Sequence, residues 1–307
     1  MSDNIIISGA TGFIGRKLTS ELVKQGNRVI ALSRNPEKYQ NFFKENVKFL
    51  RWDSQNSDSL LAPLPEVKAV INLAGENIGA GIWTRKRKER LLTSRLDFTR
   101  ALGTAVCKMK KKPAIFIQMS AIGYYGSGND TLLDESSPLG RGFLADLTNQ
   151  WEAAASGISE LGIKLVILRT GLVLGKGGGL MTRLTPAFRL FLGGHFGKGD
   201  QWMSWIHMED VVRAFQYFLT IMPSDPVYNL AAPGPVLARE FFQAVGRELG
   251  RPSWLHLPEF PLKLLLGEMA RETILSSQRV YPAKLLKAGF EFKYDQLTSA
   301  LREVLRD

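Results

Sequence analysis

Cysteine and histidine are rare in this sequence, and it contains no long hydrophobic run. Only one cysteine and three histidines occur among 307 residues. A single cysteine excludes an intrachain disulfide and a thiolate-based zinc site, and no histidine has a partner at metal-ligand spacing. Apolar stretches such as residues 165–168 are far too short to span a bilayer. We therefore expect no metal centre and no membrane-spanning segment.

A basic segment followed by an apolar core is not visible in the first residues, so we expect no secretion signal. Together with the scarcity of cysteine, this favours a cytoplasmic location. For the same reasons we expect no membrane partner.

Acidic residues are outnumbered by basic ones, 29 against 40, which gives a formal net charge of +11. Part of the excess lies in two clusters, residues 85–90 and residues 108–112. Such clusters are usually solvated faces, but they also attract phosphate-bearing ligands or nucleic acid. No nucleic-acid module signature accompanies them, so we do not favour a nucleic-acid partner.

Short apolar segments alternate with helical patterns through the first half of the chain. Because apolar strands separated by helices form a parallel sheet covered on both faces, the pattern predicts an α/β fold with a doubly wound, Rossmann-type sheet. The strands are expected at residues 4–8, 27–33, 47–52, 69–73, 114–120, 164–168 and 227–230, and the main helices at 12–25, 85–111, 143–161 and 208–218.

Beyond residue 170 the pattern loosens into glycine-rich loops and a tail with several prolines. We expect a smaller C-terminal substrate lobe beside the sheet domain. The Rossmann domain is assigned to residues 1–174, with residues 203–232 returning to it, and the lobe to residues 175–202 and 233–307.

Three glycines follow the first expected strand at a spacing of three residues. A side chain at Gly9 would obstruct the tight turn, one at Gly12 would block a pyrophosphate, and one at Gly15 would push the helix off the sheet. The spacing G-x-x-G-x-x-G differs from G-x-G-x-x-G, but the motif lies between a strand and a helix. It predicts a dinucleotide-binding turn more strongly than a plain strand–helix connection.

The end of the second strand indicates which dinucleotide is bound. NAD sites usually place an acidic residue there, whereas this chain has Ser33 and Arg34. Because an arginine can grip a 2′-phosphate through two hydrogen bonds, we predict NADP. Asp53, after the third strand, either meets the adenine edge or is a turn residue.

These residues carry a family likeness. The motifs are SGATGFIG (residues 8–15), INLAG (71–75), QMSAIGYYG (118–126), LRTGLVLG (168–175) and SWIHMED (204–210), with the tail SSQRVYPAKLLKAGFEF (276–292). The chain resembles the extended form of the short-chain dehydrogenase/reductase superfamily, and more narrowly its NAD(P)-binding "epimerase family" proteins. The likeness covers nearly the whole chain.

The resemblance implies that residues 73–75 lie beneath the adenosine and phosphates. It also implies that residues 169–173 flank the nicotinamide ribose and that Arg95, with Arg90 one turn earlier, points a cation at the cofactor. Ordinary charge on a helix face is the alternative for both arginines. The complete predicted cofactor site is Gly9, Thr11, Gly12, Phe13, Ile14, Gly15, Ser33, Arg34, Asp53, Leu73, Ala74, Gly75, Arg90, Arg95 and Val173.

The superfamily's catalytic Tyr-x-x-x-Lys is missing. Aligning on Glu152 places Leu144 and Thr148 where the tyrosine and lysine should be. The remaining catalytic candidates are Ser120, at the family's Ser/Thr position, and Tyr124, which can act as a proton donor or simply pack the loop.

Two functions stay open at this point. One is an NADP-dependent oxidoreductase or epimerase-like enzyme acting on an unknown small molecule, which we favour because the lobe is retained. The other is a non-catalytic NADP sensor or scaffold that binds a protein. Superfamily relatives often pair through their long helices, which leaves a homodimer open.

Overall fold

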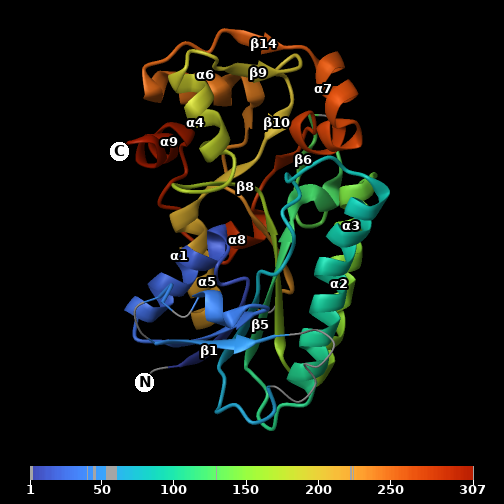
Figure 1. The fold of residues 1–307 in the computed structure, drawn as a ribbon, viewed down its shortest axis with the longest axis vertical. Coiled ribbons are helices and arrows are strands. Elements are labelled where there is room, and N and C mark those ends of the chain that lie inside the picture. The colour runs from blue at the N-terminus through green and yellow to red at the C-terminus, as the bar shows by residue number, and fades with distance from the viewer. Residues whose placement is uncertain are drawn as a thin grey trace.

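A parallel sheet forms the centre of the larger part of the protein. The structure, a computed structural model (Figure 1), describes residues 3–39, 41–43, 46–52, 61–128, 130–221, 223 and 225–306. Within these ranges seven strands pair side by side in the order β12-β7-β5-β4-β1-β2-β3, all of them parallel. Their bounds are β1 Asn4–Ser8, β2 Arg28–Ser33, β3 Val47–Arg51, β4 Ala69–Asn72, β5 Ile115–Ala121, β7 Lys164–Thr170 and β12 Val227–Leu230.

The central strands are largely apolar, as expected for a sheet that helices cover on both faces. On one face lie α1 (Phe13–Lys24) and α5 (Met208–Ile221), and on the other lie α2 (Arg85–Cys107) and α3 (Phe143–Ala155) (Figure 1). Ile5 and Ile7 belong to the first core, whereas Ile6 belongs to the second, as alternation along a strand requires. The Rossmann-type α/β fold predicted from the sequence is therefore confirmed.

A smaller lobe lies beyond the carboxyl ends of these strands, at the top of Figure 1. Its own core consists of aliphatic side chains, mainly from α4, α6 and α9, packed around aromatic ones such as Phe188, Trp205 and Phe241. Its elements are α4 (Met181–Arg189), β9 (Gly194–Phe196), β10 (Trp202–Met203), β13 (Val236–Leu237), α6 (Ala238–Leu249), β14 (Leu255–Leu257), α7 (Glu259–Leu266), a π-helical turn (Ala270–Ile274) and α9 (Leu297–Leu305).

Short elements connect the two parts. β8 (Leu172–Leu174) pairs with β11 (Trp205–His207), and β6 (Leu132–Leu133) pairs with β15 (Arg279–Val280). The remaining short elements are α8 (Ala283–Lys287) and three 3₁₀ helices, Pro36–Tyr39, Ile122–Tyr125 and Ser156–Leu161. None of the described helices is long and apolar enough to cross a membrane.

Two helices end earlier than their sequence pattern indicates. The long helix stops at Cys107 rather than near residue 111, and the Lys112 ammonium group donates hydrogen bonds to the carbonyls of Cys107 and Met109. The helix that starts at Phe143 turns into a 3₁₀ helix after Ala155. At the end of α2, Lys112 thus donates to a carbonyl that has no partner within the helix, which is a common way to end a helix.

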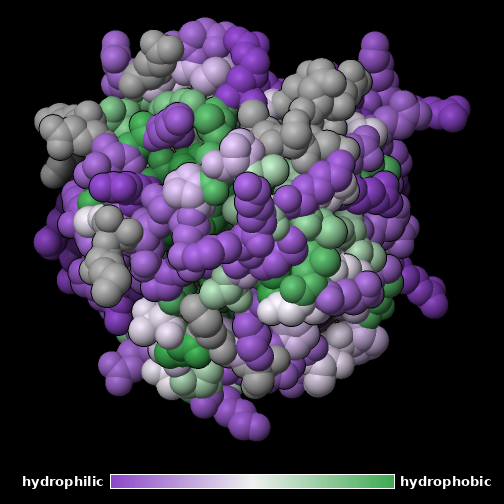
Figure 2. Space-filling model, turned by 90° about the horizontal axis from the view of Figure 1, so that it is seen from below, coloured by the Kyte–Doolittle hydropathy of each residue, from purple (hydrophilic) through white to green (hydrophobic). Residues whose placement is uncertain are grey.

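The end of the molecule opposite the lobe presents a mostly polar surface. Figure 2 shows this end, where hydrophilic side chains predominate and hydrophobic ones form separate small patches.

Candidate functional site

The turn after β1 can be formed only with glycines at two positions. Gly9 has a φ of +70°, and a Cβ atom there would lie 2.8 Å from the carbonyl oxygen of Leu73. A Cβ atom on Gly15 would lie 2.1 Å from the carbonyl oxygen of Gly9. The first contact brings β1 and β4 together at the turn, and the second packs α1 directly on it.

The N-terminus of α1 is built to accept an anion. Gly12 is the N-cap residue, no side chain caps the helix, and its first turn contains no acidic residue. The first backbone N–H groups of a helix have no partner within the helix, and the helix dipole favours negative charge there. The amides of Phe13 and Ile14, with Thr11 beside them, therefore form a cradle that could hold an anion such as a pyrophosphate.

A glycine-rich loop packs against this cradle from the lobe side. A Cβ atom on Gly178 would lie 2.1 Å from the Phe13 ring, and one on Gly179 would lie 3.0 Å from it. Arg16 of α1 donates a hydrogen bond to the carbonyl of Gly177 at 3.3 Å. The loop that follows β8, the strand containing Val173, thus meets the dinucleotide turn directly.

The carboxyl end of β2 places Ser33 and Arg34 beside this region. The Ser33 hydroxyl accepts a hydrogen bond from the amide of Asn35 at 3.2 Å, and the Arg34 side chain is exposed. The charge of Arg34 also helps to lower the pKa of the Glu76 carboxyl group. Asp53 lies outside the described residues.

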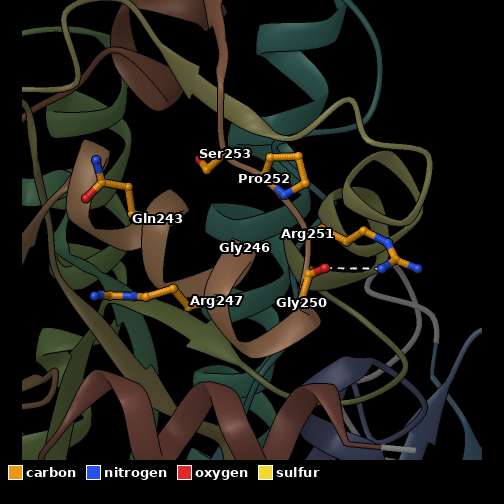
Figure 3. A pocket seen from close by; sticks show the side chains of 7 residues that line it. All are labelled: Gln243, Gly246, Arg247, Gly250, Arg251, Pro252 and Ser253. Carbon is orange, nitrogen blue, oxygen red and sulfur yellow. Dashed lines mark hydrogen bonds between the residues drawn. The ribbon is translucent and has the colours of Figure 1, made fainter.

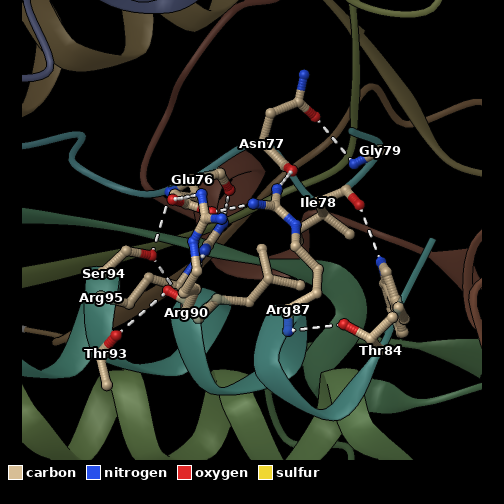
Figure 4. Close-up of polar contacts among 12 residues, drawn as sticks. Glu76, Asn77, Ile78, Gly79, Thr84, Arg87, Arg90, Thr93, Ser94 and Arg95 are labelled. Carbon is tan, nitrogen blue, oxygen red and sulfur yellow. Dashed lines mark hydrogen bonds and ion pairs between the residues drawn. The ribbon is translucent and has the colours of Figure 1, made fainter. Parts of the chain in front are cut away.

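Glu76, on the loop after β4, forms the centre of a cluster of arginines (Figure 4). Its carboxylate accepts hydrogen bonds from Arg87 and, at 2.7 Å, from Arg90. The hydrogen bond from Arg90 is the main reason that the pKa of the Glu76 carboxyl is lowered, with the charges of Arg87 and Arg34 adding to it. The sequence analysis did not identify Glu76, because nothing in its spacing links it to these arginines.

Arg95 lies beneath the same loop and is buried. Its two terminal nitrogens donate hydrogen bonds to the carbonyls of Leu91 at 3.1 Å and Glu76 at 2.9 Å, and the guanidinium group packs on the Trp151 ring. Burial lowers its pKa to about 10. A Cβ atom on Gly75 would lie 3.0 Å from this guanidinium group, so the backbone at Gly75 packs directly on it. Contact of Arg90 or Arg95 with a cofactor stays a prediction.

The rest of the basic cluster at residues 85–90 is largely matched by carboxylates. Arg85 lies 3.4 Å from Glu89 in the next helical turn, and Lys88 lies 2.8 Å from Glu268 in the lobe. These ion pairs reduce the charge that the cluster presents to a nucleic acid.

Ser120, at the carboxyl end of β5, belongs to a buried polar network. Its hydroxyl donates a hydrogen bond to Glu152 at 2.6 Å, and Arg169 contacts the same carboxylate through two nitrogens, each at 2.9 Å. The Arg169 and Glu152 side chains are only 6% and 10% exposed. Sequence reasoning used Glu152 only to align the helix. One signal could have pointed to the pair: Glu152 is an acidic residue on the largely apolar buried face of α3, and Arg169 lies near the end of the strand β7.

The two tyrosines after β5 pack against each other, and both contact Arg169. Tyr125 is buried, accepts a hydrogen bond from Arg169 at 3.1 Å and donates one to Asn229 at 2.7 Å. Burial raises the pKa of Tyr125 to about 12. The Tyr124 ring packs on the Arg169 guanidinium, 3.3 Å from ring centroid to Cζ. Tyr124 is half-buried, and its hydroxyl makes no hydrogen bond with any described residue.

Apolar packing fills the position of the missing catalytic pair. Leu144 packs with a cluster that includes Trp83 and Met269, and the Thr148 hydroxyl donates a hydrogen bond to the Leu144 carbonyl at 2.6 Å. The carboxylate of Glu272, from the lobe, accepts hydrogen bonds at 2.7 Å from the amides of Phe143 and Leu144. The lobe therefore caps the helix that normally carries the catalytic tyrosine and lysine.

The contacts of His207 connect two helices. It is buried, its Nε2 lies 2.9 Å from a carboxylate oxygen of Glu303, and its Nδ1 accepts a hydrogen bond from the amide of Glu209. It ties the start of α5 to α9.

Two family profiles match the chain. That of the NAD dependent epimerase/dehydratase family matches residues 5–231, and a domain of unknown function, DUF1731, matches residues 257–304. The chain is 37% identical to epimerase family protein YfhF of Bacillus subtilis, over 99% of this chain and 98% of that protein.

Solved structures give the same result. The structure of human epimerase family protein SDR39U1 with NADPH matches with a TM-score of 0.86 and 32% identity over 98% of both chains. UDP-glucose 4-epimerase of Thermotoga maritima shares the fold, with a TM-score of 0.81 at 19% identity. The chain therefore belongs to the NAD dependent epimerase/dehydratase family.

Proposed function

We propose that this protein binds NADP(H) across the carboxyl ends of β1, β2 and β4. The observation that carries the proposal is the N-terminus of α1. No side chain caps it, and only glycines at positions 9 and 15 allow the helix to pack so closely on the turn after β1. The amides of Phe13 and Ile14 hold the pyrophosphate, and Ser33 and Arg34 hold the 2′-phosphate. The human relative that was crystallised with NADPH supports this choice.

The 2′-phosphate selectivity can be tested at Arg34. Arg34→Ala removes a charge-assisted bidentate contact, and we expect NADPH affinity to fall at least tenfold, consistent with roughly 1.5–3 kcal/mol for a hydrogen bond to a charged group. NADH affinity should stay unchanged. Isothermal titration calorimetry measures both.

Arg28 provides the matched control, since it is an exposed arginine at the start of β2, whereas Arg34 directly follows the end of that strand. Arg28→Ala should leave NADPH affinity unaltered. Equal losses for both coenzymes in Arg34→Ala would contradict the proposed 2′-phosphate contact.

We further propose an oxidoreductase or epimerase-like reaction on a small molecule, with Tyr124 as the proton donor. When bound, the nicotinamide supplies or accepts a hydride. Tyr124 follows β5 at the edge of the sheet where the cofactor lies, and its hydroxyl is not engaged by any described residue. The Arg169 cation against its ring stabilises negative charge that develops on the phenolic oxygen during proton transfer. Ser120 acts in this proposal by holding Glu152, which positions Arg169.

Turnover can be followed by the absorbance of reduced nicotinamide, with carbonyl compounds and sugar nucleotides as substrates. Tyr124→Phe should lower kcat by about 10²–10⁴-fold while NADPH affinity stays constant, because only the proton donor is lost. Tyr217→Phe is the control, since the Tyr217 hydroxyl contacts only the Ala288 carbonyl. Full activity of Tyr124→Phe would exclude this role.

A non-catalytic NADP(H) sensor is the second candidate, and one observation favours it. Leu144 and its apolar neighbours occupy the position of the catalytic pair, and the lobe seals that helix end through Glu272. Tight NADPH binding without oxidation by any compound of a broad panel would select this function over the first.

A further inference from the structure

The outer end of the lobe exposes an unusual number of large apolar side chains. On α7 no residue is buried, and Phe260 and Leu264 are 76% and 74% exposed. Trp254 is 67% exposed, and all three residues of the segment 190–192 are exposed. Large contiguous apolar surfaces on a folded protein usually mark a contact with another surface.

These side chains belong to one continuous part of the lobe. The Trp254 amide donates a hydrogen bond to Gly193 at 3.1 Å, and its indole N–H donates one to Phe191 at 3.0 Å. β14 continues from this point beside β9 and leads into α7. Figure 1 shows β14 and α7 at the end of the molecule farthest from the strand β1, in contrast to the mostly polar opposite end in Figure 2.

A hollow of about 420 Å³ lies at the C-terminal end of α6, just before Trp254 in the chain (Figure 3). It is lined by Gln243, Gly246, Arg247, Gly250, Arg251, Pro252 and Ser253, and thus contains two arginines and no acidic residue. Neither arginine forms an ion pair with a carboxylate among the described residues.

Polar atoms of this hollow lack partners. Arg251 Nε and Ser253 Oγ are buried and make no hydrogen bond within the described residues. Buried polar groups are normally hydrogen-bonded, so these two atoms leave hydrogen-bonding capacity at the hollow unused. The Arg251 guanidinium also lies 4.7 Å from the centroid of the Phe191 ring, which joins the hollow to the apolar surface.

We propose that this end of the lobe docks on the surface of an anionic phospholipid bilayer. Phosphate groups of the lipid occupy the hollow at Arg247 and Arg251, and Trp254, Phe260 and Leu264 enter the boundary between headgroups and acyl chains. Aromatic and leucine side chains beside arginines are the combination that binds such an interface. The net charge of +11 adds long-range attraction.

This arrangement fits a bilayer better than a free phosphate compound, because the chain that lines the hollow continues directly into the exposed Trp254 and, through β14, into α7. The absence of long apolar runs excludes only spanning segments, so it does not bear on surface docking.

Sedimentation with vesicles tests the proposal. We expect the protein to bind vesicles of phosphatidylcholine mixed with phosphatidylglycerol and not vesicles of phosphatidylcholine alone. The charge variant Arg247→Gln/Arg251→Gln and the apolar variant Trp254→Ser/Leu264→Ser should each reduce binding at least fivefold. Unchanged NADPH affinity will show that both variants are folded.

Matched controls come from exposed residues elsewhere. Lys110→Gln/Lys164→Gln removes two cations from the sheet domain, and Leu132→Ser removes an exposed leucine. Both should bind vesicles as the unaltered protein does. Equal losses in the controls would show nonspecific charge attraction and overturn the proposal.

Other occupants give different results, and each would overturn the proposal. Binding of inorganic phosphate that needs Arg247 and Arg251, without vesicle binding, would assign the hollow to a free phosphate compound. A dimer in light scattering that Trp254→Ser/Leu264→Ser converts into a monomer, again without vesicle binding, would assign the surface to a second copy of the chain.

Discussion

At the scale of residues, Glu152 is the centre of the buried polar network next to the proposed proton donor. Its carboxylate joins Ser120 and Arg169 below the carboxyl ends of β5 and β7. The sequence could select Ser120 and Tyr124 as candidates, because Ser120 lies near the end of a recognisable strand and Tyr124 follows it. The Glu152–Arg169 pair was missed, because residues 17 positions apart meet only after the helix packs on the sheet.

Removing the charge of Glu152 should destabilise the protein strongly. Glu152→Gln leaves the buried Arg169 cation without its counter-ion, and we expect the free energy of unfolding to fall by about 3–5 kcal/mol. Urea denaturation measures this change. Glu160→Gln, at an exposed position in the following 3₁₀ helix, should change stability by less than about 0.5 kcal/mol.

Tyr125 should make stability depend on pH in the alkaline range. Its pKa is about 12 in the folded protein, against 10.0 for an unperturbed tyrosine. Between these values the unfolded chain releases the proton and the folded protein keeps it, so stability falls as pH rises. Thermal unfolding at a series of pH values should show a shallower decline for Tyr125→Phe than for the unaltered protein.

Some of that decline should remain in the variant, because burial also raises the pKa of Tyr228 to about 12. An identical pH dependence in the two proteins would mean that Tyr125 titrates normally in the folded state.

At the scale of elements, the sequence was most informative where local signals agree. β1 and β12 have the bounds that were expected, because apolar runs and flanking turn residues define them. The apolar lobe core and the cap of α3 could not be predicted. Glu272 reaches the α3 N-terminus from 129 positions away, and no local pattern encodes that contact.

The α3 cap gives a prediction for one helix end. Glu272→Ala removes the acceptor of two backbone N–H groups, and by analogy with N-cap substitutions it should cost about 0.5–2 kcal/mol. Hydrogen exchange should accelerate at the amides of Phe143 and Leu144. Amides in the middle of α2 should exchange at an unchanged rate, and faster exchange there would indicate general loosening instead.

At the scale of the whole molecule, the sheet domain and the lobe meet around the proposed cofactor site. Phe13 of α1 packs on the loop that enters the lobe, and Glu76 is held by arginines of α2. Ligand binding at this junction should therefore stabilise both parts together.

NADPH should raise the stability of the complete protein. At a free concentration about 100 times its Kd, a ligand that binds only the folded state adds ~2.7 kcal/mol. We expect the Tm to rise by several degrees with NADPH, and by less in Arg34→Ala. Differential scanning calorimetry at matched ligand concentrations measures both shifts, and equal shifts would argue against a contact between Arg34 and the ligand.

The hydrogen bonds between Glu272 and the first amides of α3 can form only late during synthesis on the ribosome. At a translation rate of roughly 5–20 residues per second, the 129 residues that separate Phe143 from Glu272 take about 6–26 s to emerge. During this interval the nascent helix lacks the carboxylate that completes its first turn. The N-terminal cap of α3 is therefore completed only after translation has passed Glu272.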